Sequence, residues 1–142
     1  MTVEGLAAAD KAFDEAQVKV FASSHSCLPV LQSFARDRVL INNGAAGMPN
    51  FSGLPFGLIS RIATTPSPHR ALYGMVRDGV HIDAIPIDYH GEDFLGRFLA
   101  RWPPGSAAHM SYFERITRGP DYSLAQAALP RPNDVVGHPC RA

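Results

Sequence analysis

The chain has 142 residues, of which 46% are hydrophobic and 18% charged, so it can bury the core of one domain and is not expected to be disordered. Its 13 basic and 13 acidic side chains give a formal net charge of zero, which argues against a nucleic-acid-binding surface. No apolar stretch is long enough to span a bilayer, and the acidic amino terminus does not suit a signal peptide. We therefore expect a cytoplasmic protein with no membrane partner, in which Cys27 and Cys140 are thiols or metal ligands rather than a disulfide.

Hydrophobic spacing predicts one helix and three short strands in the first third of the chain. Apolar residues recur at three- and four-residue steps over residues 5–17, which is the pattern of a helix with one buried face. Residues 19–23 follow as a strand that leaves into a polar loop. Residues 30–34 and 39–41 are predicted as two further strands joined by a polar turn.

The middle of the chain contains an irregular loop, a strand and then the clearest local pattern. Residues 42–55 are dense in Gly, Asn and Pro, which favours a loop, and residues 58–64 resume as a strand. Residues 71–77 and 80–89 flank Asp78-Gly79, a pair suited to the positive backbone angles of a tight hairpin turn. The second of these strands alternates apolar with polar side chains, so we predict a hairpin with one buried and one wet face. The alternating residues are Val80, Ile82 and Ala84 against His81 and Asp83.

The last third of the chain changes to a helical period. Leu95, Phe98, Leu99 and Trp102 define one amphipathic face that ends at two prolines and a glycine. Ser106 is placed to cap a second helix reaching Ile116, and residues 123–129 are predicted to add one or two turns more. The fold class is therefore α+β, with a mostly antiparallel β-sheet and flanking helices. We expect one domain over residues 1–129 and a flexible proline-rich tail over residues 130–142.

Two loops carry the residues that are candidates for metal binding and for a functional site. The strand at residues 19–23 ends in Ser24-His25-Ser26-Cys27-Leu28-Pro29, and the strand at residues 39–41 ends in the sequence NNGAAGMP, residues 42–49. Over roughly residues 15–90 this order resembles the carboxy-terminal half of the calcineurin-like metallophosphoesterases. In that family one strand ends in Gly-His-x-His, and a later strand ends in Asn-Pro-Gly-Ser-x-Gly-x-Pro. The resemblance implies one half of that family's αββα sandwich.

The resemblance also implies a role for each matching position. The family hydrolyses phosphomonoesters or phosphodiesters with two divalent ions about 3.5–4 Å apart that activate a bridging water. By position, His25 would bind one ion and Cys27 the other, while Asn42, Asn43 and Gly44 would form a site loop. Cys27 stands where the family has histidine, and a thiolate favours zinc over manganese or magnesium. The implied cofactors are divalent ions: zinc, manganese or iron.

The other ligands of the family have no counterpart in this chain. They lie upstream in Asp-x-His, Gly-Asp-x-x-Asp and Gly-Asn-His motifs, and none of the 24 residues before His25 matches them. Asp10 and Asp14 lie in the helical pattern and are interpreted as solvated. Two ligands cannot hold a dinuclear centre, so we assign no catalytic residue and expect no catalysis from the chain alone. Open strand edges predict a homo-oligomer or a complex with a complementary N-terminal fragment.

Three other hypotheses remain open. The chain could be a non-catalytic interaction module, which predicts no metal retention. It could also be a small structural zinc-binding domain in which His25, Cys27, His138 and Cys140 supply four ligands. A thiol hydrolase with Cys27 as nucleophile is disfavoured, because no general base can be assigned. The remaining histidines, His69, His81, His90 and His109, are interpreted as exposed or structural.

Overall fold

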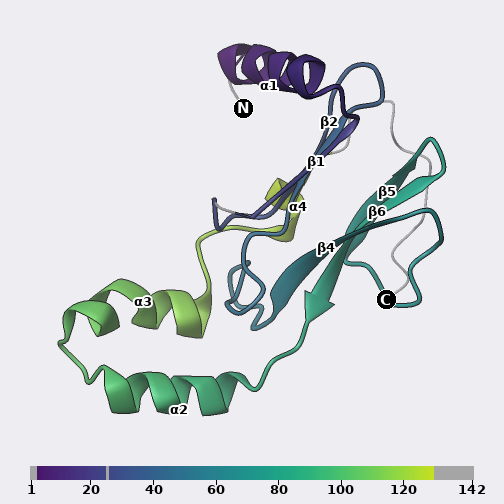
Figure 1. Cartoon of the computed structure of the whole chain (residues 1–142). Coiled ribbons are helices and arrows are strands. Elements are labelled where there is room, and N and C mark those ends of the chain that lie inside the picture. The colour runs from purple at the N-terminus through teal and green to yellow at the C-terminus, as the bar shows by residue number, and fades with distance from the viewer. Residues whose placement is uncertain (1–2, 25, 130–142) are drawn as a thin grey trace.

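The computed structural model describes residues 3–24 and 26–129 of the chain. Within these residues seven strands form two sheets, and four helices lie around them (Figure 1). No helix among the described residues is both long and apolar enough to cross a membrane. In chain order the elements are α1 (Val3–Ala16), β1 (Val20–Ser23), β2 (Val30–Ser33), β3 (Val39–Asn42), β4 (Gly57–Ala63), β5 (Tyr73–Arg77), β6 (Val80–Ile87), α2 (Gly91–Arg101), α3 (Ala107–Arg118), α4 (Leu124–Ala127) and β7 (Ala128–Leu129).

The strands divide into a four-stranded and a three-stranded sheet. The first has the order β1-β3-β2-β7, with β1 parallel to β3 and β2 antiparallel to β3. The second has the order β4-β6-β5 and is antiparallel throughout. The predicted α+β class with mostly antiparallel pairing is confirmed, but two small sheets replace the single sheet that the sequence suggested. Packing one sheet on another buries apolar faces that a single short sheet would leave wet.

The core lies between the two sheets. Leu31, Val39 and Ile41 of the first sheet pack in one cluster with Ile82 and Ala84 of the second. Ile82 and Ala84 are fully buried and Val80 packs partly buried against the same cluster, whereas His81 and Asp83 are partly exposed. The predicted alternation is therefore confirmed from Val80 to Ala84, although the next residue, Ile85, is buried as well. The face that carries Val80, Ile82 and Ala84 is the one that packs against the first sheet.

The β5–β6 hairpin forms at the predicted turn. Arg77 pairs with Val80, and the two residues between them have positive φ angles of 49° at Asp78 and 76° at Gly79. Such a two-residue turn has a twist that matches the strands it joins, and Asp-Gly tolerates its backbone angles. The local sequence is thus sufficient to fix the register of this hairpin.

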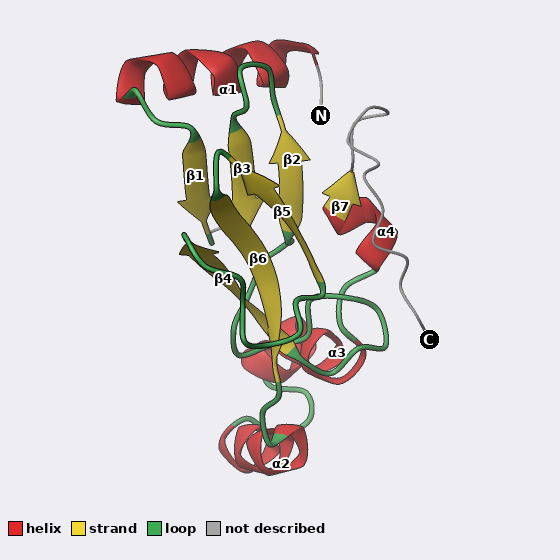
Figure 2. Cartoon of the chain, turned by 90° about the vertical axis from the view of Figure 1, so that its right-hand side faces the viewer, coloured by secondary structure: helices red, strands yellow, loops and turns green. Residues whose placement is uncertain are grey.

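The three longer helices, α1, α2 and α3, lie at opposite ends of the molecule, and α4 lies beside β7. Figure 2 shows α1 across one end of β1, β3 and β2, with α2 and α3 at the other end. Ser106 caps α3 as predicted, since its hydroxyl accepts a hydrogen bond from the His109 amide at 3.3 Å. The predicted helix over residues 123–129 is wrong in its last two residues. These residues form β7 instead, because the open edge of β2 offers backbone partners and Leu31 pairs with Ala128.

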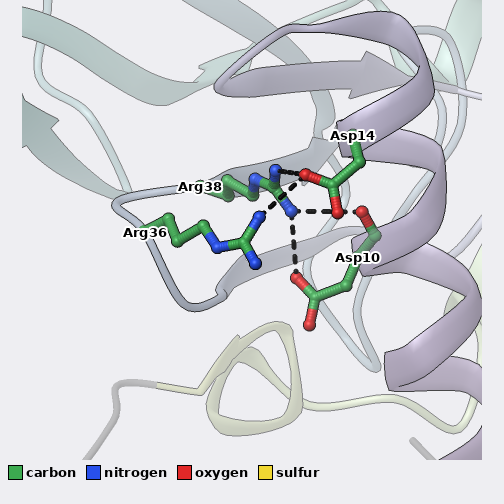
Figure 3. A network of polar contacts seen from close by, with 4 residues as sticks. All are labelled: Asp10, Asp14, Arg36 and Arg38. Carbon is green, nitrogen blue, oxygen red and sulfur yellow. Dashed lines mark hydrogen bonds and ion pairs between the residues drawn. The ribbon is translucent and has the colours of Figure 1, made fainter.

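An ion-pair network attaches α1 to the turn between β2 and β3 (Figure 3). Asp14 accepts hydrogen bonds from both Arg36 and Arg38, and the Arg38 guanidinium also contacts Asp10. Arg38 is buried and lies 5.5 Å from the centre of the Phe13 ring, while Phe13 itself is fully buried. Asp10 and Asp14 are solvent-accessible, as the sequence pattern indicated, with side chains 44% and 52% exposed, and they also form ion pairs that the pattern did not predict. A helical pattern alone did not reveal two arginines that are distant in sequence.

Candidate functional site

The two loops singled out in the sequence begin at the same end of the first sheet, where β1 and β3 both end. Strands β1 and β3 are parallel neighbours, and their last residues, Ser23 and Asn42, are register partners. The ends of adjacent parallel strands lie side by side, so the loop at residues 24–29 starts next to the loop at residues 43–50. His25 lies outside the described residues, whereas Cys27 and Asn42 to Gly44 are described.

Asn42 ties these two loops together. Its side-chain nitrogen donates to the hydroxyl of Ser23 at 3.0 Å and to that of Ser26 at 2.9 Å. Its side-chain oxygen accepts a hydrogen bond from the Gly44 amide at 2.7 Å. A further bond runs from the Ser24 hydroxyl to the Gly44 carbonyl at 3.3 Å. Asn42 is only 5% exposed, so it acts as a buried bridge between the loops.

Asn43 has a different position from its neighbour. Its side chain donates to the Leu58 carbonyl on β4 at 2.8 Å, and its amide donates to the Ser23 carbonyl at 3.2 Å. The side chain therefore links the first sheet to the second and is half-buried between them. Both asparagine side chains therefore have structural hydrogen bonds, Asn42 mainly to serine hydroxyls and Asn43 to a main-chain carbonyl.

Gly44 is required by close packing against Asn50. Gly44 has a φ of 67°, and a Cβ built on it would lie 2.2 Å from the Asn50 side-chain oxygen. Asn50 is fully buried and accepts from the Ala45 amide at 2.7 Å while donating to the Ala45 carbonyl at 2.6 Å. It also donates to the Met48 carbonyl at 3.3 Å. Asn50 is a loop-organising residue that sequence reasoning missed, although a polar side chain between Pro49 and Phe51 is a signal for it.

Cys27 lies at a left-handed position in its loop. Its φ is 54° and its side chain is exposed. The Arg115 guanidinium on α3 donates to the Cys27 carbonyl at 2.9 Å. The Tyr122 hydroxyl donates to the Pro29 carbonyl, with an oxygen–oxygen distance of 2.8 Å. These two residues were not predicted, because separations of 88 and 93 residues leave no local signal in the sequence.

The electrostatic environment of Arg115 reflects its position beside this loop. Burial lowers the pKa of Arg115, and the nearby Cys27 thiol and Tyr89 phenol partly oppose that effect. Burial likewise raises the pKa of Tyr89 and of Tyr122. The half-buried guanidinium of Arg115 therefore interacts electrostatically with both the Cys27 loop and Tyr89.

The described residues do not form a metal centre by themselves. Within residues 3–24 and 26–129, no three His, Cys, Asp or Glu side chains come together as a set that could hold an ion. Cys27 is the one predicted ligand in this part of the chain, and His25, His138 and Cys140 lie outside it. The four-ligand zinc hypothesis therefore rests on residues that are not described. A shallow cavity of about 360 Å³ lies at the other end of the first sheet, beside Phe13 and Arg38.

The other histidines do not join the loops that follow β1 and β3. His69 is exposed in the turn before β5, and His81 is partly exposed on β6. His90 precedes α2, and its side chain makes no capping hydrogen bond. His109 stacks on Phe113 within α3, with ring centres 4.6 Å apart.

Comparison of the chain with protein-family models, curated proteins and solved structures finds no match.

Proposed function

We propose that this chain is a metallophosphoesterase-like carboxy-terminal segment that contributes one corner of a phosphoester-hydrolase site. Support comes from one observation above all: the loops carrying Cys27 and Gly44 leave neighbouring parallel strands and are joined by Asn42, whose side chain lies 2.9 Å from the Ser26 hydroxyl. A metal-binding loop needs such a rigid backbone, because ligands must be held in place before the ion arrives.

The donor set limits what the chain can do alone. His25 and Cys27 are its two candidate ligands, and a dinuclear centre needs more carboxylate, amide and imidazole donors than these. The residues present therefore do not fit a complete centre, and no catalytic step is assigned to them. In this proposal the remaining ligands come from a complementary N-terminal polypeptide.

Zinc titration tests the metal-binding part of the proposal. Isothermal calorimetry should detect one zinc ion per chain, lost in Cys27→Ser and in His25→Ala. The matched control is Cys140→Ser, which should bind zinc like the unmodified chain, since a thiol outside the loop is not a ligand in this proposal. Loss of zinc in Cys140→Ser would favour the four-ligand structural site instead. Failure of the unmodified chain to bind zinc would oppose the proposal directly.

Catalysis is tested separately. Hydrolysis of an aryl phosphodiester should be absent from the chain alone, with or without added manganese or zinc. Activity should appear only when a polypeptide carrying the missing Asp and His motifs is added. Activity that survives Cys27→Ser under those conditions would show that this loop does not serve the site.

A second candidate function is a non-catalytic interaction module. Exposed apolar side chains on the two outer strands of the second sheet favour it: Ile59 is 39% exposed, Ile62 44% and Val76 50%. Open edges and exposed apolar groups favour association with another chain. Under this hypothesis, light scattering should show an oligomer that Val76→Lys dissociates, and a chelator should leave the melting temperature unchanged.

A further inference from the structure

The segment from Arg115 to Tyr122 holds the Cys27 loop through its backbone. Arg115 donates to the Cys27 carbonyl at 2.9 Å. The Tyr122 hydroxyl has one proton to donate; it lies 2.8 Å from the Pro29 carbonyl oxygen and 3.0 Å from that of Gln126. The two acceptors in the Cys27 loop are main-chain oxygens on either side of Leu28. Two bonds to carbonyls two residues apart constrain both the position and the direction of that short stretch.

The same segment is bonded to the loop between β3 and β4, which includes Ser52 and Gly53. The Gly53 amide donates to the Arg118 carbonyl at 2.8 Å, and the Ser52 amide donates to the Tyr122 carbonyl at 2.9 Å. Between them, Gly119 has a φ of 74°, and a Cβ there would lie 2.2 Å from the Phe51 carbonyl oxygen. The end of α3 therefore contacts the loop after β3 closely, and from this anchor it reaches the loop after β1.

Cys27 needs such an external hold. A non-glycine residue with a φ of 54° adopts a backbone conformation that costs about 1 kcal/mol or more, and the conformation persists only where surrounding contacts impose it. Arg115 is half-buried, and its second terminal nitrogen is buried with no hydrogen-bond partner among the described residues. The bond to the Cys27 carbonyl is thus the polar contact that offsets part of the cost of burying this guanidinium.

We propose that Arg115 and Tyr122 are positioning residues that set the direction of the Cys27 side chain, so that α3 controls the geometry of the loop. The ordering of the loop follows from the contacts alone, and its consequence for metal binding rests on the proposed function. Helices α2 and α3 extend away from the two sheets (Figure 1). Because Arg115 on α3 bonds to the Cys27 carbonyl, a displacement of α3 would break this bond and allow the loop to move.

The loop can be observed directly with a nitroxide label on Cys27. In a Cys140→Ser background, Cys27 is the sole cysteine and is exposed to the reagent. Electron paramagnetic resonance at a temperature well below unfolding should report restricted motion in the parent protein. Arg115→Met, and to a smaller extent Tyr122→Phe, should add a fast-moving component to the spectrum. Arg115→Lys keeps a donor and a charge and should restore most of the restricted signal.

The matched control is Arg118→Met, which removes an exposed arginine from the same turn of α3 while its backbone bond to Gly53 remains. Spectra of Arg115→Met and Arg118→Met that are identical to the parent would overturn the inference. If Arg115→Lys restores the restricted spectrum, the hydrogen-bond donor at this position is what orders the loop. A general loss of stability would affect both variants.

Metal binding by the unlabelled proteins separates this inference from the proposed function. If both hold, Arg115→Met should weaken zinc binding about tenfold, and Arg118→Met should leave it unchanged. If the label is released in Arg115→Met but the parent binds no zinc, the positioning role is supported and the proposed function fails. If the parent binds zinc and the label does not respond to Arg115→Met, the positioning role fails.

Discussion

Different polar interactions stabilise the two ends of the first sheet. At the end covered by α1, four charged side chains form the network of Asp10, Asp14, Arg36 and Arg38 (Figure 3). At the end that carries the loops after β1 and β3, the amide side chains of Asn42 and Asn50 link the segments, with Asn50 fully buried and bonded to main-chain atoms, and Arg115 adds a bond to the Cys27 carbonyl. The charged end is partly exposed, with Asp10 and Asp14 side chains 44% and 52% accessible.

This difference has a physical consequence. Ion pairs near the surface are screened by salt and disappear when a carboxylate is protonated. Amide groups do not titrate, and a buried amide with all its partners keeps its hydrogen bonds over a wide pH range. A loop that must present ligands is therefore supported by groups whose charge does not vary.

The largest effect is expected at Asn50. Asn50→Ala leaves the Ala45 amide and carbonyl without their side-chain partner in a buried place, which should lower the free energy of unfolding by about 3 kcal/mol. Urea denaturation measures this change. Asn43→Ala is the matched control, because that half-buried side chain makes one hydrogen bond, and it should cost about 1 kcal/mol. Equal costs for the two variants would contradict the role given to Asn50.

The next largest effect is expected at Arg38. Arg38→Met removes the one buried arginine of the network and should lower the melting temperature by several degrees, because α1 loses the hydrogen bonds that Arg38 donates to Asp10 and Asp14. Arg36→Met should have a much smaller effect, since the Arg36 side chain is 71% exposed. Circular dichroism at the helical band would report both changes. A similar loss in both variants would show that burial of Arg38 is not what matters.

Acid should act on the α1 end and spare the site end. The hydrogen bond from Arg38 lowers the pKa of Asp14 below its ordinary value of 3.8. A carboxyl with a lowered folded-state pKa contributes stability above the unfolded pKa and loses it as pH falls through the folded one. Stability should therefore decrease below about pH 4, and this slope should be reduced in Asp14→Asn. The destabilisation caused by Asn50→Ala should be equal at pH 7 and at about pH 3, since an amide does not titrate.

The smallest effect at neutral pH is expected at Tyr73, in the core near Tyr122. The Tyr73 hydroxyl is buried with no hydrogen-bond partner among the described residues, so Tyr73→Phe should be neutral or stabilise by up to about 1 kcal/mol. Burial also raises the pKa of Tyr73 well above its ordinary value of 10. The parent should then lose stability as pH rises above 10, where the unfolded tyrosine ionises first, and Tyr73→Phe should remove that loss. Tyr112→Phe, at a tyrosine that is 51% exposed, is the control.

Local sequence patterns predicted most of the helices and strands. The Asp78-Gly79 turn, the alternation along β6 and the cap at Ser106 all depend on neighbouring residues, so their physical causes are visible in the sequence. The proximity of the loops after β1 and β3 was expected from a family resemblance. In the structure this proximity follows from the parallel pairing of β1 with β3, in which Ser23 and Asn42 are register partners.

The sequence by itself therefore determined the elements, the turns and the positions of two loops rich in polar residues. Only the tertiary structure decided that two sheets stack, that β7 adds to the edge of β2, and that Asp14 meets Arg38. It also decided that Arg115 and Tyr122 reach the Cys27 loop, across 88 and 93 residues of chain. Local propensity acts over a few residues, whereas contacts between distant segments depend on how every apolar face is buried at once.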